Sequence, residues 1–362
     1  MFDLIVIGGG PAGSSAAISA ARTGARVLLL ERGRFPRQKV CGEFVSAESL
    51  GLLGNLLDAN HRSLLTGASR IEQTRVFLDD QALHARIHPA AASIARLDLD
   101  DALWNSTEAV GAETRQQVTV QQVRGSAPFA VSTAAGDFEA KAVVNASGRW
   151  SNLNPGPAKE DRARWIGLKA HFQEASPPAS VDLYFFEGGY CGVQPVELRG
   201  DAGQSRVNAC AMVRADVAST LQEVFRRHPV LFERSRQWRQ LGDPVSTAPL
   251  MFREPQPERD GILMAGDAAC FVDPFVGDGI SLALRSGALA AESLLPFFRR
   301  EISISEASRR YCEAYVRRYG MVFQNSSKIR RMLRLPRAVR RPAMALLAKT
   351  PAVTEYLVRK TR

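Results

Sequence analysis

The sequence predicts an α/β protein with a second domain built on an antiparallel sheet and a helical C-terminal tail. Three observations carry this prediction. The first thirty residues alternate strand, glycine-rich turn, helix and strand, which is the pattern of a βαβ unit. The middle third contains apolar and alternating runs typical of antiparallel strands. Residues 305–362 are charged, with apolar positions at helical spacing.

The N-terminal unit begins with an apolar strand at residues 2–7. A helix is predicted at 14–23, and Gly24 directly after it is expected to end the helix. The chain then returns in a second apolar strand at 26–31. These elements form one complete βαβ unit.

The turn between the first strand and the helix reads Gly8-x-Gly10-x-x-Gly13. Gly8 permits a tight turn, Gly10 lets a pyrophosphate approach the backbone, and Gly13 lets the helix pack on the strand. Glu31 ends the second strand, where a carboxylate can accept hydrogen bonds from ribose hydroxyls. The unit is therefore predicted to be of the Rossmann type and to bind a dinucleotide.

The remaining elements are predicted in chain order. They are a hairpin at 75–87 that turns at Asp79 and Asp80, a helix at 96–108, short strands within 117–146, strands at 181–186, 190–193 and 206–213, a helical stretch at 216–241, a buried strand at 261–265, a helix at 279–299 and a charged helix from residue 305.

A second glycine-rich turn follows the strand at 261–265. That strand delivers Asp267 at its carboxyl end, and the turn at 273–280 opens a helix at Gly279. Backbone N–H groups at a helix N-terminus can stabilise the negative charge of a reduced flavin. An ordinary strand-to-helix turn is the alternative interpretation.

These motifs together resemble the FAD-dependent oxidoreductases of the p-hydroxybenzoate hydroxylase type, and within them the geranylgeranyl reductase-like branch. The loop at 35–42, Phe-Pro-Arg-Gln-Lys-Val-Cys-Gly, is similar to a loop that lies over the flavin in geranylgeranyl reductases. Glu43 departs from the pattern, because many such reductases have glycine there. The resemblance implies bound FAD in a discontinuous, glutathione reductase-like domain.

The resemblance also implies a division into domains. The FAD-binding domain is expected at 1–74, 93–165 and 250–304, the substrate domain at 75–92 and 166–249, and the helical basic tail at 305–362.

The resemblance further implies a set of cofactor contacts. Glu31 would hold the adenosine ribose, Arg96 the FAD and Asp267 the ribityl chain. The expected FAD-binding residues are Gly8, Gly10, Ala12, Gly13, Glu31, Arg32, Cys41, Gly42, Arg96, Gly266, Asp267, Pro274, Gly277, Gly279 and Ile280.

Cys41 is the candidate catalytic residue. Arg37 and Lys39 would favour its thiolate if it lies near the flavin. The alternative is a small buried side chain that packs as a hydrophobe.

Three aromatic residues of the middle third, Tyr184, Phe186 and Tyr190, are candidate substrate contacts, with sheet packing as the alternative. His84, His88 and His171 are expected to be structural.

The predicted activity is hydride transfer through flavin N5 to or from a hydrophobic, isoprenoid- or polyketide-like substrate. An FAD monooxygenase is the first alternative, although Ser147 stands where the aromatic hydroxylases carry aspartate. A halogenase is less favoured, because the Trp-x-Trp-x-Ile-Pro signature is absent. A flavin-free protein that binds prenylated partners is the third alternative. Only one dinucleotide fingerprint is present, so NAD(P)H would bind transiently as reductant or a protein would supply electrons.

The net charge and the cysteine content indicate which partners and metal sites the protein can have. The net charge is +10, and residues 328–362 account for it, with 11 Lys/Arg against one acid. The neutral body argues against a nucleic-acid partner. The five cysteines form no C-x-x-C pair, so no metal site is expected. The chain is expected to be cytoplasmic, with the basic tail lying on an anionic membrane, docking an acidic partner or capping the body.

Overall fold

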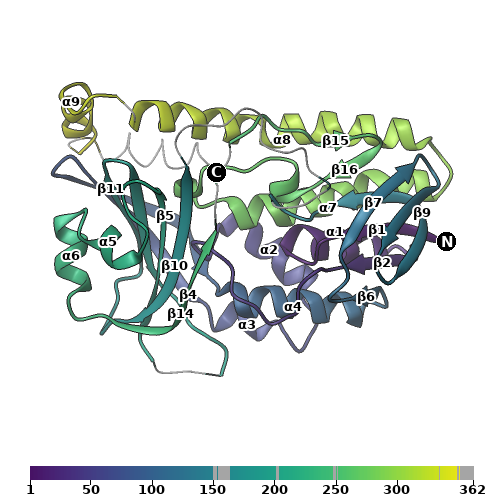
Figure 1. The fold of residues 1–362 in the computed structure, drawn as a ribbon, viewed down its shortest axis with the longest axis horizontal. Coiled ribbons are helices and arrows are strands. Elements are labelled where there is room, and N and C mark those ends of the chain that lie inside the picture. Colours follow the sequence, from purple (N-terminus) through teal and green to yellow (C-terminus); the bar gives the residue numbers. More distant parts are fainter. Residues whose placement is uncertain are drawn as a thin grey trace.

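The computed structural model describes residues 1–149, 153, 164–200, 204–247, 250, 252–333, 335–348 and 350. Two eight-stranded sheets lie at opposite ends of the molecule, and a long helix, α8 (Ile304–Leu333), runs beside both (Figure 1). The expected α/β class is confirmed, with an antiparallel-rich second sheet and a helical C-terminal region.

The first sheet is built on the predicted βαβ unit. β1 (Phe2–Ile7) pairs in parallel with β2 (Val27–Leu30), and the strand order is β15-β16-β9-β1-β2-β6. The other members are β6 (Glu113–Arg115), β7 (Val120–Gly125), β8 (Phe129–Thr133), β9 (Gly136–Asn145), β15 (Glu258–Arg259) and β16 (Ile262–Met264). Because β1, β9 and β16 are parallel neighbours, their carboxyl ends meet at one edge.

Helices cover this sheet and fix the glycine turn. They include α1 (Pro11–Ala21), α4 (Arg96–Ala109) and α7 (Gly279–Phe298). α1 and α7 touch through their backbones, since a Cβ added at Gly287 would lie 2.0 Å from the carbonyl oxygen of Ala12. The N-termini of α1 and α7 both belong to the glycine-rich turns found in the sequence.

The second sheet has the order β14-β10-β13-β12-β11-β4-β5-β3. Its pairs are antiparallel except β11 with β4. Its strands are β3 (Phe44–Val45), β4 (Ser69–Leu78), β5 (Gln81–Ser93), β10 (Trp165–Gln173), β11 (Ser180–Phe186), β12 (Gly189–Pro195), β13 (Arg206–Arg214) and β14 (Arg239–Thr247). The short helices are α2 (Ala47–Leu56), α3 (Ser63–Thr66), α5 (Leu221–Phe225), α6 (Pro229–Ser235) and α9 (Arg337–Ala348). The domain boundaries given above stay a prediction.

The prediction of a helical stretch at 216–241 is wrong for its last residues. Two short helices, α5 and α6, occupy its middle, and the chain then enters β14 at Arg239. β14 is an edge strand paired with β10, and its residues are mostly exposed, so it lacks the apolar alternation that identifies a strand. Long-range pairing decides the structure here.

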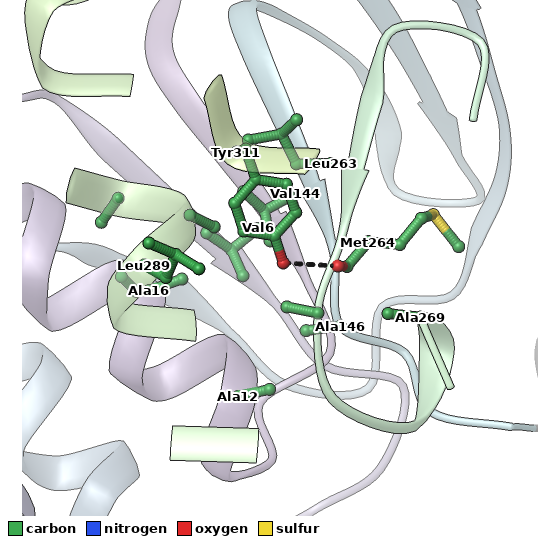
Figure 2. Packing of buried hydrophobic residues seen from close by; sticks show 14 of the residues in the cluster. Val6, Ala12, Ala16, Val144, Ala146, Leu263, Met264, Ala269, Leu289 and Tyr311 are labelled. Atoms are coloured by element: carbon green, nitrogen blue, oxygen red, sulfur yellow. Dashed lines mark hydrogen bonds between the residues drawn. The ribbon is translucent and has the colours of Figure 1, made fainter. Parts of the chain in front are cut away.

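Tyr311 ties α8 to the first sheet. Its side chain is fully buried, and its hydroxyl donates a 2.7 Å hydrogen bond to the carbonyl oxygen of Met264 among Val6, Val144 and Leu289 (Figure 2). We expect Tyr311→Phe to lower the free energy of unfolding by about 1–2 kcal/mol, because it leaves a buried acceptor with one donor fewer. Urea denaturation measures this change. An unchanged midpoint at unchanged m-value would contradict it.

Candidate active site

A cavity of about 1040 Å³ lies between the two sheets. The glycine turn after β1 and the second glycine turn before α7 form one part of its wall. Residues of β11, β12 and β13 form the facing part, and the last turns of α8 add Lys328, Ile329, Met332 and Leu333 to the lining. Both sheets therefore contribute to one continuous cavity.

The glycine turn has the shape that a pyrophosphate requires. Gly8 has a φ of 102°, and a Cβ there would lie 2.5 Å from the carbonyl oxygen of Ala146. A Cβ at Gly13 would lie 1.8 Å from the Gly8 oxygen. At Gly10 the nearest atom to an added Cβ is 3.9 Å away, on Arg96, so open space remains above the N-terminus of α1. The turn fits a dinucleotide.

The Glu31 carboxylate accepts hydrogen bonds from the backbone of this turn and of the loop after β2. Its Oε2 accepts a 2.8 Å hydrogen bond from the Gly9 N–H, and its Oε1 accepts one of 2.7 Å from Gly33 N–H. Burial opposes ionisation, but Arg37, paired at 2.9 Å, and these two amides hold the pKa of Glu31 below its usual value. Glu31 is therefore an ionised carboxylate beside the glycine turn.

Arg96 places a fixed positive charge beside the turn. Its Nε and Nη2 each donate a 2.7 Å hydrogen bond to the buried carboxylate of Asp100. Burial alone would lower the pKa of Arg96, but the Asp100 carboxylate raises it. The guanidinium therefore stays charged. This group faces the cavity where a pyrophosphate would lie.

Cys41 lines the cavity, but its surroundings do not favour the thiolate that the sequence suggested. Burial raises the pKa of the Cys41 thiol despite the opposing charge of Arg96. Arg37 pairs with Glu31 instead, and burial lowers the pKa of Lys39 to about 8. The Sγ of Cys41 accepts a 3.3 Å hydrogen bond from Glu43 N–H. Cys41 is therefore a neutral thiol at neutral pH.

A buried ionic cluster beside Cys41 was missed from the sequence. Lys169 Nζ lies 2.8 Å from Oε1 of Glu43, and His171 Nε2 lies 2.8 Å from Oε2. None of the three residues is more than 4% exposed. β10, which carries Lys169 and His171, was not predicted. One feature of the sequence could have pointed to this cluster: Glu43 stands where the family resemblance leads us to expect glycine.

The position of each aromatic substrate candidate along its strand decides whether its side chain faces the cavity. On β11, Leu183 and Phe185 line the cavity. Tyr184 and Phe186 point to the opposite face, because successive side chains alternate along a strand. There Tyr184 stacks on Phe77 at 4.7 Å, so the substrate assignment of Tyr184 and Phe186 is corrected to sheet packing.

Tyr190, on β12, does line the cavity. Of the expected FAD-binding residues, only Gly13 lies outside the cavity wall, where it packs against Gly8. The structure thus brings the remaining candidates together around one space.

Within the described parts of the chain, no group of His, Cys, Asp or Glu side chains is arranged to hold a metal ion. In the same residues, no helix is long and apolar enough to cross a membrane.

Comparison with known proteins agrees with this site. Residues 3–149 match the family model of FAD dependent oxidoreductases. Digeranylgeranylglycerophospholipid reductase 2 of Methanopyrus kandleri is 26% identical over 356 residues, which cover 90% of this chain and 85% of the relative.

Two solved structures share the fold. A geranylgeranyl bacteriochlorophyll reductase-like protein from Thermoplasma acidophilum superposes with a TM-score of 0.77 at 19% identity, covering 99% of this chain and 95% of that one. A flavin-dependent brominase gives a TM-score of 0.80 at 20% identity, covering 99% and 93%.

Fold and site together define a dinucleotide-binding flavoprotein. The chain is an FAD-dependent oxidoreductase that resembles the geranylgeranyl reductase-like branch of the p-hydroxybenzoate hydroxylase type.

Proposed function

We propose that the chain transfers a hydride between FAD and a hydrophobic, isoprenoid-like substrate. The observation that carries this proposal is the apolar arm of the cavity, which extends from the Cys41 loop to the last turn of α8. Its lining includes Val76, Leu78, Leu83, Leu183, Phe185 and Leu333. An apolar lining recognises a hydrocarbon chain by excluding water from it. The reductase relative acts on such a lipid by its name.

The residues around Cys41 suit the proton that accompanies hydride transfer. FAD, once bound and reduced by an external donor such as NAD(P)H, would supply the hydride from its N5 position. Reduction of a carbon–carbon double bond also requires one proton at the neighbouring carbon. The neutral Cys41 thiol can donate that proton, and the charge of Arg96 with the Glu43 N–H then stabilises the thiolate left behind.

Ion pairs tie α9 to the hairpin that lines the apolar arm. Arg340 donates a 2.8 Å hydrogen bond to Asp79 at the tip of the β4–β5 hairpin, and Arg337 pairs with Asp80. The same hairpin contributes Leu78 and Leu83, which pack with Leu333 of α8. The basic tail therefore forms part of the substrate cavity as well as a charged surface.

Titration with isoprenoid alcohols tests the proposed substrate class. We expect geranylgeraniol to perturb the flavin absorption spectrum at micromolar concentration and geraniol to do so much more weakly, because the longer chain fills more of the apolar arm. Leu183→Asp should abolish the perturbation without loss of FAD. Equal responses to the two alcohols, or none, would contradict an isoprenoid-like substrate.

The exposed face of the tail supports an additional proposal of attachment to an anionic membrane. Residues 335–362 carry seven Lys/Arg and one Glu, and Leu335 and Val339 are 42% and 57% exposed. Each basic residue near an anionic surface contributes about 1 kcal/mol. Deleting 335–362 should therefore weaken sedimentation with phosphatidylserine vesicles at least about tenfold. Phosphatidylcholine vesicles provide the control, and unchanged sedimentation with phosphatidylserine would contradict the membrane proposal.

A further inference from the structure

The buried cluster of Glu43, Lys169 and His171 is not among the residues expected to bind the dinucleotide. We propose that Glu43 is a positioning residue for the Cys41 thiol, because its side chain is locked to the second sheet while its backbone N–H is held against the sulfur. The inference rests on the proposed function only for the importance of the thiol in the reaction.

The Glu43 side chain is fixed from two separate elements. Lys169 and His171 lie two residues apart on β10 and so point to the same side of the strand. Each reaches one carboxylate oxygen at 2.8 Å. The N–H of Arg96, at the start of α4, donates a third hydrogen bond of 2.9 Å to Oε1. A carboxylate with three buried donors has one orientation.

The backbone of Glu43 transmits this constraint to the sulfur. Its φ is 62°, a left-handed conformation that glycine adopts freely and other residues rarely do. In this conformation its N–H points at Cys41 Sγ, at 3.3 Å, and its carbonyl accepts a 2.9 Å hydrogen bond from Ile94 N–H. Glycine would satisfy the backbone at this position, but it would lack every side-chain contact that holds the backbone in place.

The loop before Glu43 is tied to the same sheet. Lys169 Nζ also donates a 2.6 Å hydrogen bond to Gln38 Oε1, and Asn208 Nδ2 donates one of 3.0 Å to the Cys41 carbonyl. Cys41 therefore lies between two points at which Lys169 anchors the loop. One buried cation on β10 thus holds the cavity-facing segment from both sides of the thiol.

The charges around the thiol give this arrangement a measurable consequence. Burial is the main reason that the pKa of Cys41 is raised, and the Glu43 carboxylate raises it further. Arg96, from α4, and the Glu43 N–H oppose this rise. Cys210 of β13 lies nearby as a neutral thiol, because burial raises its pKa well above the usual value.

Further charged groups near the thiol lie on β10 and on the loop at 35–42. Lys169 and His171 compensate Glu43 from β10, and Arg37 and Lys39 belong to the loop itself. Removing the carboxylate charge should therefore lower the pKa of Cys41, since Arg96 remains in place.

Alkylation of Cys41 in the FAD-bound protein tests the proposal. The rate of iodoacetamide modification is followed from pH 6 to pH 10 by peptide mass spectrometry, which separates Cys41 from the other four cysteines. We expect Glu43→Gln to move the Cys41 profile to lower pH and to raise the rate at pH 7 at least about threefold, since the thiolate is the reactive form. His171→Gln keeps the carboxylate and a hydrogen-bond donor to it, and should stay closer to the profile of the parent protein than Glu43→Gln does.

A second variant keeps the test valid if Glu43→Gln does not fold, since that change leaves Lys169 buried without its partner. The double variant Glu43→Gly/Lys169→Met removes both charges, and glycine suits the left-handed backbone. Glu43 acts on the pKa of Cys41 more strongly than Lys169 does, so this variant should show a smaller shift of the Cys41 profile in the same direction, to lower pH. A profile equal to that of the parent protein, in either folded variant with stoichiometric FAD, would overturn the proposal.

The experiment is independent of the proposed reaction, because alkylation requires no substrate. A shifted profile together with full turnover in Cys41→Ser would support the positioning of the thiol and contradict its role as proton donor. An unshifted profile together with lost turnover in Cys41→Ser would contradict the role of Glu43 alone.

Discussion

Gly10→Val is expected to leave the protein folded and to weaken FAD binding at least about 100-fold, or ~3 kcal/mol. A Cβ at Gly10 meets no atom closer than 3.9 Å, so the protein itself accommodates the side chain. The open space above the N-terminus of α1 is where a pyrophosphate must approach the backbone, and the valine methyl groups would occupy it. Flavin content after purification and circular dichroism measure the two effects separately.

Gly13→Val provides the matched control for this prediction. A Cβ there would lie 1.8 Å from the backbone oxygen of Gly8, so this variant should lose both its fold and its flavin. Stoichiometric flavin in Gly10→Val would show that the turn after β1 does not hold the pyrophosphate.

Cys41→Ser is expected to lower the rate of substrate reduction by about 10²–10⁴-fold, which is the usual contribution of a general acid. A serine hydroxyl is a far weaker acid than a thiol of similar size, so hydride transfer would lack its accompanying proton. FAD content should be unchanged, because the glycine turn and Glu31 are predicted to hold the cofactor. Single-turnover oxidation of the prereduced enzyme by a geranylgeranyl phospholipid measures the rate.

Cys210→Ser is the control for Cys41→Ser. Cys210 lines the same cavity, but no hydrogen bond to Glu43 N–H holds its sulfur. Its replacement should change the rate less than about threefold, within the range of an ordinary packing change. A parental rate in Cys41→Ser would exclude the thiol as proton donor.

The parts of the fold that could be predicted are those that local sequence determines. The Gly8 to Gly13 turn and Glu31 belong to one short βαβ unit, so spacing alone brings them together. The strand ending before Gly266 and the helix opening at Gly279 were equally visible, because an apolar run and a glycine turn lie next to each other in the chain.

The rest of the site depends on contacts between distant residues. Glu43 and Lys169 are 126 positions apart and meet only because β10 packs against the loop before β3. Tyr184 and Phe185 differ only in register, and the pairing of β11 decides which one faces the cavity. The pKa of Cys41 depends on burial, which composition does not reveal, so the neighbouring Arg37 and Lys39 suggested the wrong protonation state.

Anaerobic stopped-flow spectroscopy of the photoreduced protein tests the central claim most directly. The reduced protein is mixed with a geranylgeranyl phospholipid in the absence of oxygen, and the flavin absorbance is followed. A hydride-transferring enzyme with an isoprenoid-like substrate should be reoxidised by the lipid, with one double bond saturated per flavin, and should react slowly with oxygen. No reoxidation by the lipid, together with rapid reoxidation by oxygen, would contradict the account and indicate a monooxygenase or halogenase.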